Sequence, residues 1–291
     1  MIGPAAAPPP WKELGRFVEI QNLGLNLPFA FAFLWVAAQG LPSLRTILLV
    51  AVAFLAARNA GHGFNRYADR FWDAQTPRTR ARPLVLSRSA TAFTLAFVAA
   101  NSAILIVAAY FLNPLALVLA PVALLLIFAY SYTKRVTSLT TAFLGLVEAI
   151  TPAAAFVAVT GTLPLPAWIA IGAMLLWGTA FEMIHSLGDI ESDRRLGLYS
   201  LPARFGRTRT LRTIPIVHGL ALALFGLFGW AAHLSSPYYL GIAAMVAVTA
   251  WTDVTLLRAP EAPRGPFRRH FLLGAIFFVG TTIAVFLPFT I

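Results

Sequence analysis

Nine apolar segments, each long enough to cross a lipid bilayer as a helix, dominate this sequence. The hydrocarbon core of a membrane is about 30 Å thick, and a helix needs roughly 20 apolar residues to span it. The chain is 59% hydrophobic and 11% charged, and one water-soluble core cannot enclose that much apolar surface. The sequence therefore predicts an all-α integral membrane protein of about nine transmembrane helices. We expect them near residues 23–41, 47–68, 91–112, 115–133, 141–160, 167–188, 212–232, 238–256 and 270–289.

The residues before the first apolar segment have a different character. Residues 1–10 contain four prolines, a composition typical of disorder. Residues 11–20 alternate apolar with charged side chains, which favours a short helix lying in the membrane interface. We therefore expect residues 1–22 to form an N-terminal tail with an interfacial helix, and residues 23–291 to form the transmembrane domain.

Basic residues gather on one side of the predicted helix array. If the N-terminus is cytoplasmic, the opposite side carries only Arg45. This asymmetry follows the positive-inside rule. It predicts a multi-pass protein of the cytoplasmic (inner) membrane, with its N-terminus in the cytoplasm and its C-terminus outside. The net charge of +11 then requires no nucleic-acid partner. The basic segments on the cytoplasmic side are Lys12 and Arg16, the loop 69–90, Lys134 and Arg135, the loop 189–212 and the loop 257–269.

Two of the predicted helices end in clusters of polar and acidic residues. Intervals of three and four residues place each cluster on one helical stripe. The second helix carries Arg58, His62, Asn65, Asp69 and Asp73, and the sixth carries Glu182, His185, Asp189 and Asp193. Asn65 to Asp73 covers about 12 Å of the helix axis at about 1.5 Å per residue.

The two aspartate pairs are related by position in the chain. Asp69 and Asp189 are separated by the same 120 residues as Asp73 and Asp193. We interpret this as an internal duplication, with a first repeat at 23–135, a second at 136–256 and a ninth helix at 270–289 added to them. Membrane proteins commonly place their sites at such repeat interfaces. The duplication predicts two facing aspartate clusters across a central cavity.

Four carboxylates at one mouth of a helix bundle repel one another unless a cation lies between them. The sequence contains no cysteine, so a metal must be held by oxygen or imidazole. Mg²⁺ prefers oxygen ligands and is commonly shared between carboxylates and substrate phosphates, which suits a prenyl diphosphate. The alternative is that the aspartates only cap or solvate helix ends, but two copies in register disfavour it. Candidate phosphate ligands in the nearby loops are Arg78, Arg80, Arg82, Lys134, Arg194 and Arg204.

Three motifs resemble those of the UbiA superfamily of intramembrane aromatic prenyltransferases. The segment Asn65-Arg-Tyr-Ala-Asp69-Arg-Phe-Trp-Asp73 is similar to the first aspartate motif of that family. Tyr130-Ser-Tyr-Thr-Lys134 resembles its Tyr-x-x-x-Lys element, and Gly188-Asp189-Ile-Glu-Ser-Asp193 resembles its second aspartate motif. The chain looks most like bacterial 4-hydroxybenzoate polyprenyltransferase-like proteins. One departure is Arg66, because many members have an aspartate at that position.

The resemblance implies Mg²⁺-dependent transfer of a polyprenyl group from polyprenyl diphosphate to a hydroxylated aromatic acid, with membrane lipid as the surroundings. It implies 4-hydroxybenzoate as the acceptor, in quinone biosynthesis as for ubiquinone. A dihydroxynaphthoate acceptor, for menaquinone, is the alternative. The implied catalytic metal ligands are Asp69, Asp73, Asp189 and Asp193. The implied diphosphate ligands are Asn65, Tyr130, Lys134, Arg78, Arg82, Arg194 and Arg204.

Arg58 is the candidate for binding the acceptor. An arginine about halfway along an apolar helix is costly unless it has an anionic partner or faces a polar cavity. Arg58 lies about 10 Å from Asn65 along the helix axis, a gap that can hold one aromatic ring. A guanidinium matches the two oxygens of a carboxylate. The alternative is a structural or phosphate-side role, with Arg58 paired to Glu148 or Glu182.

A function from a different class is secondary transport, since a transporter also combines a repeat with intramembrane acids. Its carboxylates should lie near the middle of the bilayer on broken helices. The aspartates of this chain lie instead at predicted helix ends, next to arginine-rich loops. That placement favours phosphate binding over a translocation path.

Overall fold

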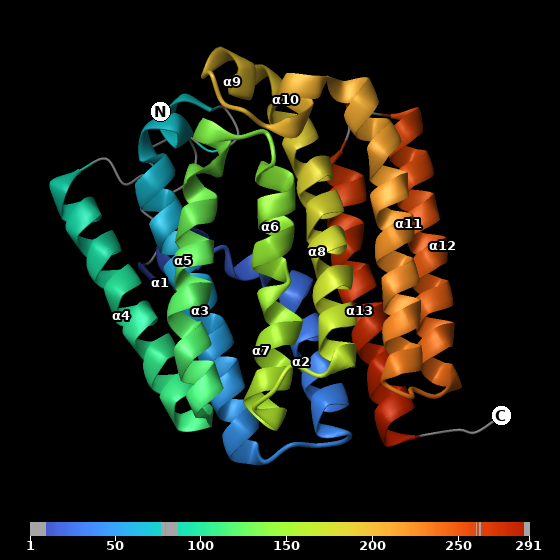
Figure 1. Cartoon of the computed structure of the whole chain (residues 1–291). Helices are drawn as coiled ribbons and strands as arrows, with labels where there is room; N and C mark the ends of the chain where they lie inside the picture. The colour runs from blue at the N-terminus through green and yellow to red at the C-terminus, as the bar shows by residue number, and fades with distance from the viewer. Residues whose placement is uncertain (1–9, 77–78, 80–86, 260, 262, 288–291) are drawn as a thin grey trace, which may run out of the picture.

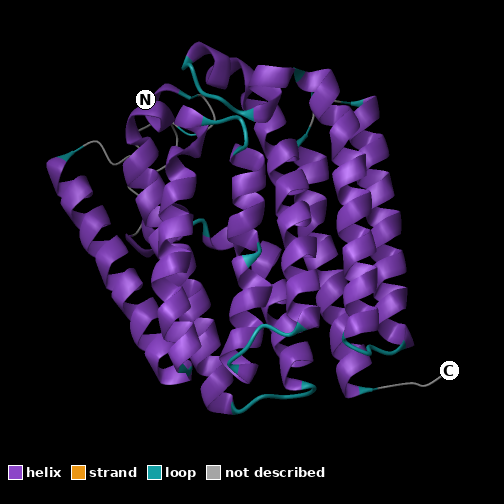
Figure 2. Ribbon diagram, in the orientation of Figure 1, coloured by secondary structure: helices purple, strands orange, loops and turns teal. Residues whose placement is uncertain are grey.

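The structure is a computed structural model that describes residues 10–76, 79, 87–259, 261 and 263–287, and its helices form one bundle (Figure 1). Helix is the regular structure of these described residues, which contain no strand (Figure 2). Nine helical spans in this part of the chain are long and apolar enough to cross a membrane. The predicted all-α membrane fold is therefore confirmed. The internal duplication stays a prediction.

Most of the spans are single helices. They are α2 (Leu23–Ala38), α3 (Leu44–Gln75), α4 (Arg88–Leu112), α5 (Pro114–Val136), α8 (Leu165–Ser186), α11 (Arg207–Ala231), α12 (Ser236–Arg258) and α13 (Arg264–Phe286). The fifth span is interrupted, because one residue separates α6 (Thr140–Glu148) from α7 (Ile150–Thr160). Shorter helices are α1 (Pro10–Phe17), η1 (Ile20–Asn22), η2 (Leu187–Asp189), α9 (Ile190–Arg195) and α10 (Leu201–Phe205).

Two spans run well past the ends that hydropathy predicts. The second span continues to Gln75 and the sixth, through η2 and α9, to Arg195, whereas the apolar segments end near 68 and 188. Hydropathy locates the part of a helix that crosses hydrocarbon, but polar residues continue the same helix beyond it. As a consequence, all four aspartates lie on helical backbone rather than in loops.

Side-chain caps explain where several spans begin. Ser43 Oγ accepts the backbone N–H of Thr46 at 3.1 Å, and Asn113 Oδ1 accepts that of Ala116 at 2.9 Å. The first turn of a helix leaves backbone N–H groups without intrahelical partners, and such caps satisfy them. Asn113 also ends α4, so one residue separates α4 from α5 and sets the two helices antiparallel.

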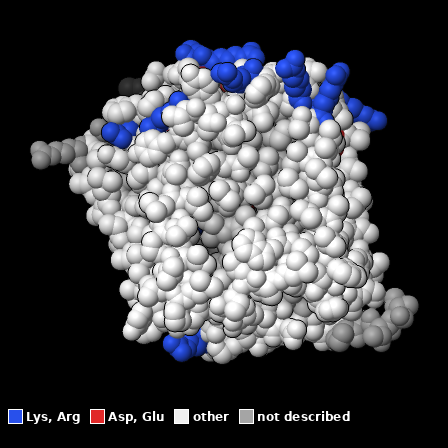
Figure 3. Space-filling view, viewed as in Figure 1, with Lys and Arg blue, Asp and Glu red and all other residues white. Residues whose placement is uncertain are grey.

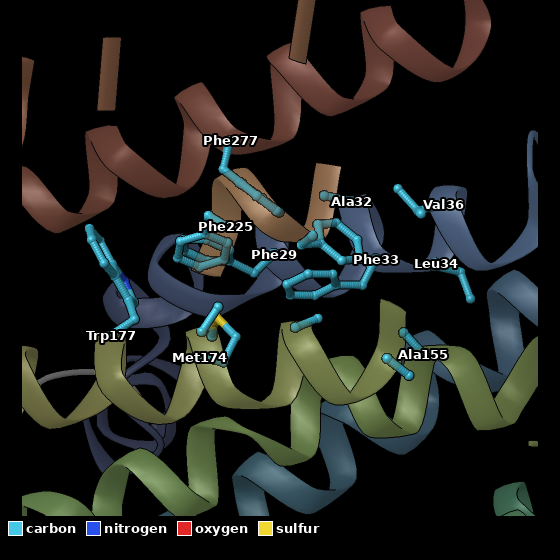
Figure 4. Close-up of a cluster of buried hydrophobic side chains, with 14 of the residues drawn as sticks. Phe29, Ala32, Phe33, Leu34, Val36, Ala155, Met174, Trp177, Phe225 and Phe277 are labelled. Carbon is cyan, nitrogen blue, oxygen red and sulfur yellow. The ribbon is translucent and has the colours of Figure 1, made fainter. Parts of the chain in front are cut away.

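An aromatic core joins the helices of one half of the bundle. Phe29 and Phe33 of α2 pack against Phe277 of α13, with ring centroids 4.9 Å and 5.3 Å apart. Phe225 of α11 and Trp177 of α8 complete this group (Figure 4). These interlocking rings make α2, α8, α11 and α13 a densely packed unit.

The surface has the charge pattern expected of a membrane protein. Lys and Arg side chains gather at the end of the bundle where α9 and α10 lie, and only a small basic spot appears at the opposite end (Figure 3). Uncharged residues form the broad middle of the face shown, and large apolar side chains such as Leu48, Val107 and Trp168 are exposed. This surface suits hydrocarbon rather than water as the surrounding solvent.

Segment 10–22 packs on the bundle more closely than an interfacial helix requires. Phe17 and Val18 are buried, and Phe97 of α4 packs against them. The rings of Phe17 and Phe97 meet edge to face at 5.6 Å. This contact holds Phe17 and Val18 against α4, next to the cavity described below.

Two glycines let α6 and α8 approach closely. A Cβ on Gly145 would overlap the backbone carbonyl of Leu175 on α8, and a Cβ on Gly178 would lie 2.7 Å from Cγ of Glu148. Small residues at helix crossings commonly serve this purpose in membranes. The close crossing sets the position of Glu148 at the end of α6.

We expect Gly145→Ala to lower the melting temperature of the detergent-purified protein, because relieving the overlap with Leu175 must separate α6 from α8. Overpacking of this kind costs about 1–3 kcal/mol. Gly219→Ala on α11 is the matched control, since nothing lies within 4 Å of its added Cβ. Equal melting temperatures for the two variants would contradict the role given to Gly145.

Candidate functional site

A cavity of about 1840 Å³ lies within the bundle, and both predicted aspartate pairs line it. At one end its walls carry Asp69 and Asp73 from α3 together with Asp189 and Asp193 from η2 and α9. Further in, the lining is mostly apolar, with small side chains such as Ala53, Ala123 and Ala154 from α3, α5 and α7. The cavity thus combines a charged mouth with a long hydrophobic interior.

The first aspartate cluster is held by hydrogen bonds from two helices. Asn65 Nδ2 donates to Asp69 Oδ2 at 2.8 Å, as their four-residue spacing allows. Arg135 of α5 donates from Nη2 to Asp69 Oδ1 at 2.9 Å, and its guanidinium lies over the ring of Trp72, 4.1 Å from the centroid. Arg135 therefore fixes both the carboxylate and the aromatic side chain at the cavity mouth.

The second aspartate cluster is more deeply buried than the first. Asp189 and Asp193 are each 4% exposed. The helix tightens into the 3₁₀ turn η2 before α9, so the two carboxylates do not follow one regular α-helical stripe as predicted. Both still line the cavity. Oδ2 of Asp193 is buried with no hydrogen-bond partner, which leaves a carboxylate oxygen available for a cation.

Contacts between the ends of helices bring the three motifs together. Arg195, which follows the second cluster, donates from Nη2 to the carbonyl of Gln75 at 2.9 Å, at the end of the first cluster's helix. The backbone N–H of Tyr199 donates to the carbonyl of Lys134 at 2.7 Å. These bonds tie α9 and its loop to the ends of α3 and α5.

The donor set fits a hard divalent cation. Four carboxylates and the amide of Asn65 offer the oxygen ligands that Mg²⁺ prefers. In the described part of the chain no three His, Asp or Glu side chains are already gathered as a metal centre. Asp69 contacts Arg135 at 2.9 Å, and Asp73 contacts Arg66 at 3.8 Å.

The predicted phosphate ligands divide into three groups. Asn65, Tyr130 and Lys134 line the cavity. Arg194 and Arg204 are exposed and are not part of its lining, so their role stays a prediction. Arg78, Arg80 and Arg82 lie outside the described residues.

Glu182 holds the inner end of the phosphate-side group. It is 1% exposed and accepts a hydrogen bond from the hydroxyl of Tyr130 at 3.3 Å. Its carboxylate also lies 3.9 Å from Nζ of Lys134 and 3.1 Å from Nδ1 of His185. Glu182 thus positions Tyr130 and Lys134 of α5 from the facing helix α8.

Arg58 lines the cavity about two turns deeper than Asn65, as predicted from their spacing. Its guanidinium donates to the backbone carbonyls of Val18 at 2.5 Å and Glu19 at 2.6 Å. No ion pair within 4.0 Å joins it to Glu148 or Glu182, which are both described. The N-terminal segment therefore orients Arg58 through two backbone carbonyl groups.

Glu19 is held in an unusual conformation by a second arginine. Its φ of 51° lies in the left-handed region, which is uncommon for a residue other than glycine. Arg66, whose side chain is 3% exposed, contacts the Glu19 carboxylate at 2.7 Å. Arg66 is the residue at which the first motif departs from the pattern of many family members. Its ion pair with Glu19 joins segment 17–22 to α3.

Sequence reasoning missed Glu19, Arg66 and Arg135 as parts of the cavity wall. Arg135 carried a signal, since it is adjacent to Lys134 in a matched motif. Glu19 carried none, because an acidic residue in an interfacial helix is normally solvated. Asp253, an acid within a predicted span, pairs with His218 at 2.8 Å between α12 and α11, outside the cavity lining.

Comparisons with known proteins agree with this geometry. The model of the "UbiA prenyltransferase family" matches residues 26–286. A 4-hydroxybenzoate octaprenyltransferase from Azoarcus sp. (strain BH72) is 33% identical over 268 residues, which cover 91% of this chain and 92% of that protein. A protein of the same name from Xanthomonas euvesicatoria pv. vesicatoria is 34% identical over 284 residues, covering 94% and 91%.

Solved structures share the fold. A UbiA homolog from Aeropyrum pernix K1 superposes with a TM-score of 0.82 at 29% identity, covering 91% of this chain and 98% of its own. A UbiA homolog from Archaeoglobus fulgidus bound to DMAPP and Mg²⁺ gives a TM-score of 0.76 at 16% identity, with coverage of 94% and 99%. At the latter identity the likeness concerns the fold alone.

A double-mutant cycle of Glu19→Gln and Arg66→Met should show strong coupling in unfolding free energy, because each single change breaks the 2.7 Å ion pair between side chains that are only 14% and 3% exposed. Breaking a buried ion pair costs about 3–5 kcal/mol. The control cycle uses Arg207 and Glu261, a pair in which Glu261 is 78% exposed, where we expect less than about 1 kcal/mol. Coupling no larger than in the control would refute the fastening of segment 17–22 by Arg66.

Proposed function

Because the chain belongs to the UbiA prenyltransferase family and is a prenyltransferase, we propose that it transfers a polyprenyl group from polyprenyl diphosphate to 4-hydroxybenzoate in quinone biosynthesis. The observation that carries this proposal is one large cavity that has two aspartate pairs at its mouth, apolar walls within, and Arg58 on its lining. The names of the two bacterial relatives support this acceptor over dihydroxynaphthoate.

The charged mouth is the proposed diphosphate site. Asp69, Asp73, Asp189 and Asp193 would hold Mg²⁺ there, together with Asn65. A bound Mg²⁺ would supply positive charge that stabilises the leaving diphosphate. Lys134 and Arg135 line the same end of the cavity and bind the remaining phosphate oxygens.

The apolar interior is the proposed site of the prenyl tail. Alanine, leucine and valine side chains of α3, α5 and α7 line it, so a hydrocarbon chain leaves the lipid without exposing itself to water. Trp72 and Tyr130 also line the cavity near the mouth. Their ring faces stabilise positive charge that develops on the allylic carbon as the carbon–oxygen bond breaks.

The acceptor binds below the diphosphate in this proposal. Its carboxylate pairs with Arg58, whose guanidinium the carbonyls of Val18 and Glu19 hold in place. The ring carbon next to the hydroxyl attacks the allylic carbon, and the ring then loses a proton. Positioning the two substrates in one water-poor cavity favours attack by the ring over hydrolysis.

We place the cavity mouth on the cytoplasmic side of the cytoplasmic membrane. The basic end of the bundle in Figure 3 supports this orientation through the positive-inside rule. Polyprenyl diphosphate and a hydroxylated aromatic acid then meet from the lipid and the cytoplasm. Secondary transport, the alternative from another class, has no support from the family of the chain.

Asp69→Asn, Asp73→Asn, Asp189→Asn and Asp193→Asn should each lower the rate of prenyl transfer by about 100-fold or more, equal to about 2.7 kcal/mol. Each change removes part of the charge that holds the metal and diphosphate. The assay follows radiolabelled prenyl diphosphate into the aromatic product, with melting temperature as the check on folding. Full activity of the wild type in EDTA would refute the metal requirement.

Arg58→Met should raise KM for 4-hydroxybenzoate by at least about tenfold, or about 1.4 kcal/mol, while KM for prenyl diphosphate stays nearly unchanged. Arg45→Met is the matched control, because Arg45 lies on the same helix but outside the cavity lining. A loss that falls on prenyl diphosphate instead would place Arg58 in the phosphate site.

A further inference from the structure

Glu148 is a membrane-embedded carboxylate that the aspartate clusters do not include. It is the last residue of α6, at the interruption before α7, and it lines the main cavity. α6 begins at Thr140, shortly after Lys134 and Arg135 at the mouth end of α5, and Glu148 is about 12 Å from Thr140 along the helix axis. Asn65 is about 10 Å from Arg58 on α3. Glu148 therefore lies below the mouth, near the proposed acceptor rather than the diphosphate.

The packing makes room specifically for this side chain. Gly178 on α8 lies against the stem of Glu148, and any larger residue there would collide with its Cβ and Cγ. An acid inside a transmembrane span is costly, and it is normally retained for a role in the cavity it faces.

The hydrogen bonds of the carboxylate are incomplete. Oε1 accepts from Nδ2 of Asn26 at 3.0 Å, whereas Oε2 is buried without a partner. A buried acceptor oxygen with no donor costs free energy until a donor arrives. The site is therefore prepared for a hydrogen-bond donor.

Arg58 and Glu148 face the same cavity and lie within electrostatic range, yet each contacts neutral groups instead of the other. An aromatic acid with a hydroxyl across its ring carries matching groups at its two ends: an anion for Arg58 and a hydrogen-bond donor for Glu148. The pair thus forms the two ends of a site for such a molecule.

We propose that Glu148 is a further catalytic residue, which takes the hydroxyl proton of the aromatic acceptor while Arg58 binds its carboxylate. This inference rests on the proposed function. The O–H bond breaks, its proton moves to Glu148, and its electron pair raises the electron density of the ring. The neighbouring ring carbon then bonds to the allylic carbon, and the diphosphate leaves with the electron pair of the carbon–oxygen bond.

The remaining protons balance within the same site. The alkylated ring loses its C–H proton to the departing diphosphate, and Glu148 returns its proton to the ring oxygen. The net products are the prenylated hydroxy acid, diphosphate and one proton, so no oxidant or further reactant is needed.

Other groups around Glu148 define the alternative role. Glu182 of α8 is within electrostatic range, and His270 of α13 lines a cavity of about 40 Å³ that Glu148 and Asn26 also line. That cavity can hold one water. A purely structural Glu148 would bond to Asn26 and such a water and would not affect the acceptor's ionisation.

The direct test is the absorption spectrum of bound acceptor, since a hydroxybenzoate absorbs at longer wavelength once its hydroxyl ionises. We would add 4-hydroxybenzoate and its 2-fluoro and 3-fluoro derivatives to the full-length protein in nanodiscs with Mg²⁺ and inorganic diphosphate. The wild type should show the ionised form and Glu148→Gln the neutral form. Glu148→Asp, which keeps the carboxylate, should recover part of the ionised spectrum.

Rates provide a second readout. Glu148→Gln should lower kcat at least about tenfold with 4-hydroxybenzoate, with KM for prenyl diphosphate within about twofold of the wild-type value. The deficit should shrink with the more acidic fluorinated acceptors. Asp253→Asn is the control, because Asp253 is an intramembrane acid outside the cavity lining, and its bound spectrum should match the wild type.

The results distinguish the role of Glu148 from the proposed prenyl transfer. Identical bound spectra for the wild type and Glu148→Gln, with a rate ratio that stays constant across the acceptors, would overturn the role of Glu148 alone. If the wild type prenylates none of these acids, the proposed function itself fails.

Discussion

The charged side chains within the bundle line a cavity or pair with one another, because an ionised side chain that faces hydrocarbon loses its solvation. The cavity gathers Arg58, Glu148, Glu182 and the four aspartates on its walls, and the basic side chains collect at one end of the bundle. This constraint makes one compartment both the polar interior of the protein and the place where two substrates of opposite character meet. It also explains why contacts from arginine to a carboxylate or a backbone carbonyl recur around the cavity.

The bundle is packed differently in its core and around its cavity. The interlocking rings of α2, α8, α11 and α13 form a dense core, and the span that begins with α8 continues through η2 and α9, which carry the second aspartate pair. Around the cavity, α3, α5 and α7 present small side chains, and α7 also packs Ala155 and Phe156 into the dense core. A rigid core can hold catalytic side chains in place, while the cavity admits a long hydrocarbon chain. Segment 17–22 completes the wall through Arg58 and Arg66.

Apolar length and residue spacing predict much of this arrangement from sequence alone. The main exceptions are contacts between different elements. Apolar length predicts nine spans, and four-residue spacing predicts that Asn65 and Asp69 share a face, because both depend on one helix at a time. The contacts of Arg135 with Asp69 and of Arg66 with Glu19 join different elements, so spacing does not reveal them. The break after Glu148 lies four residues before Pro152, which has no N–H to donate to the Glu148 carbonyl, and the 3₁₀ turn at Asp189 is a second local departure that apolar spacing does not predict.

The central claim is that this cavity joins a prenyl chain to an aromatic ring. The most direct measurement supplies purified protein in nanodiscs with isotopically labelled polyprenyl diphosphate, 4-hydroxybenzoate and Mg²⁺, and identifies the products by mass spectrometry. The account predicts a new carbon–carbon bond at the ring position next to the hydroxyl, with one diphosphate released for each ring alkylated. Diphosphate release without any alkylated ring, or passage of the intact aromatic acid across the membrane, would contradict it.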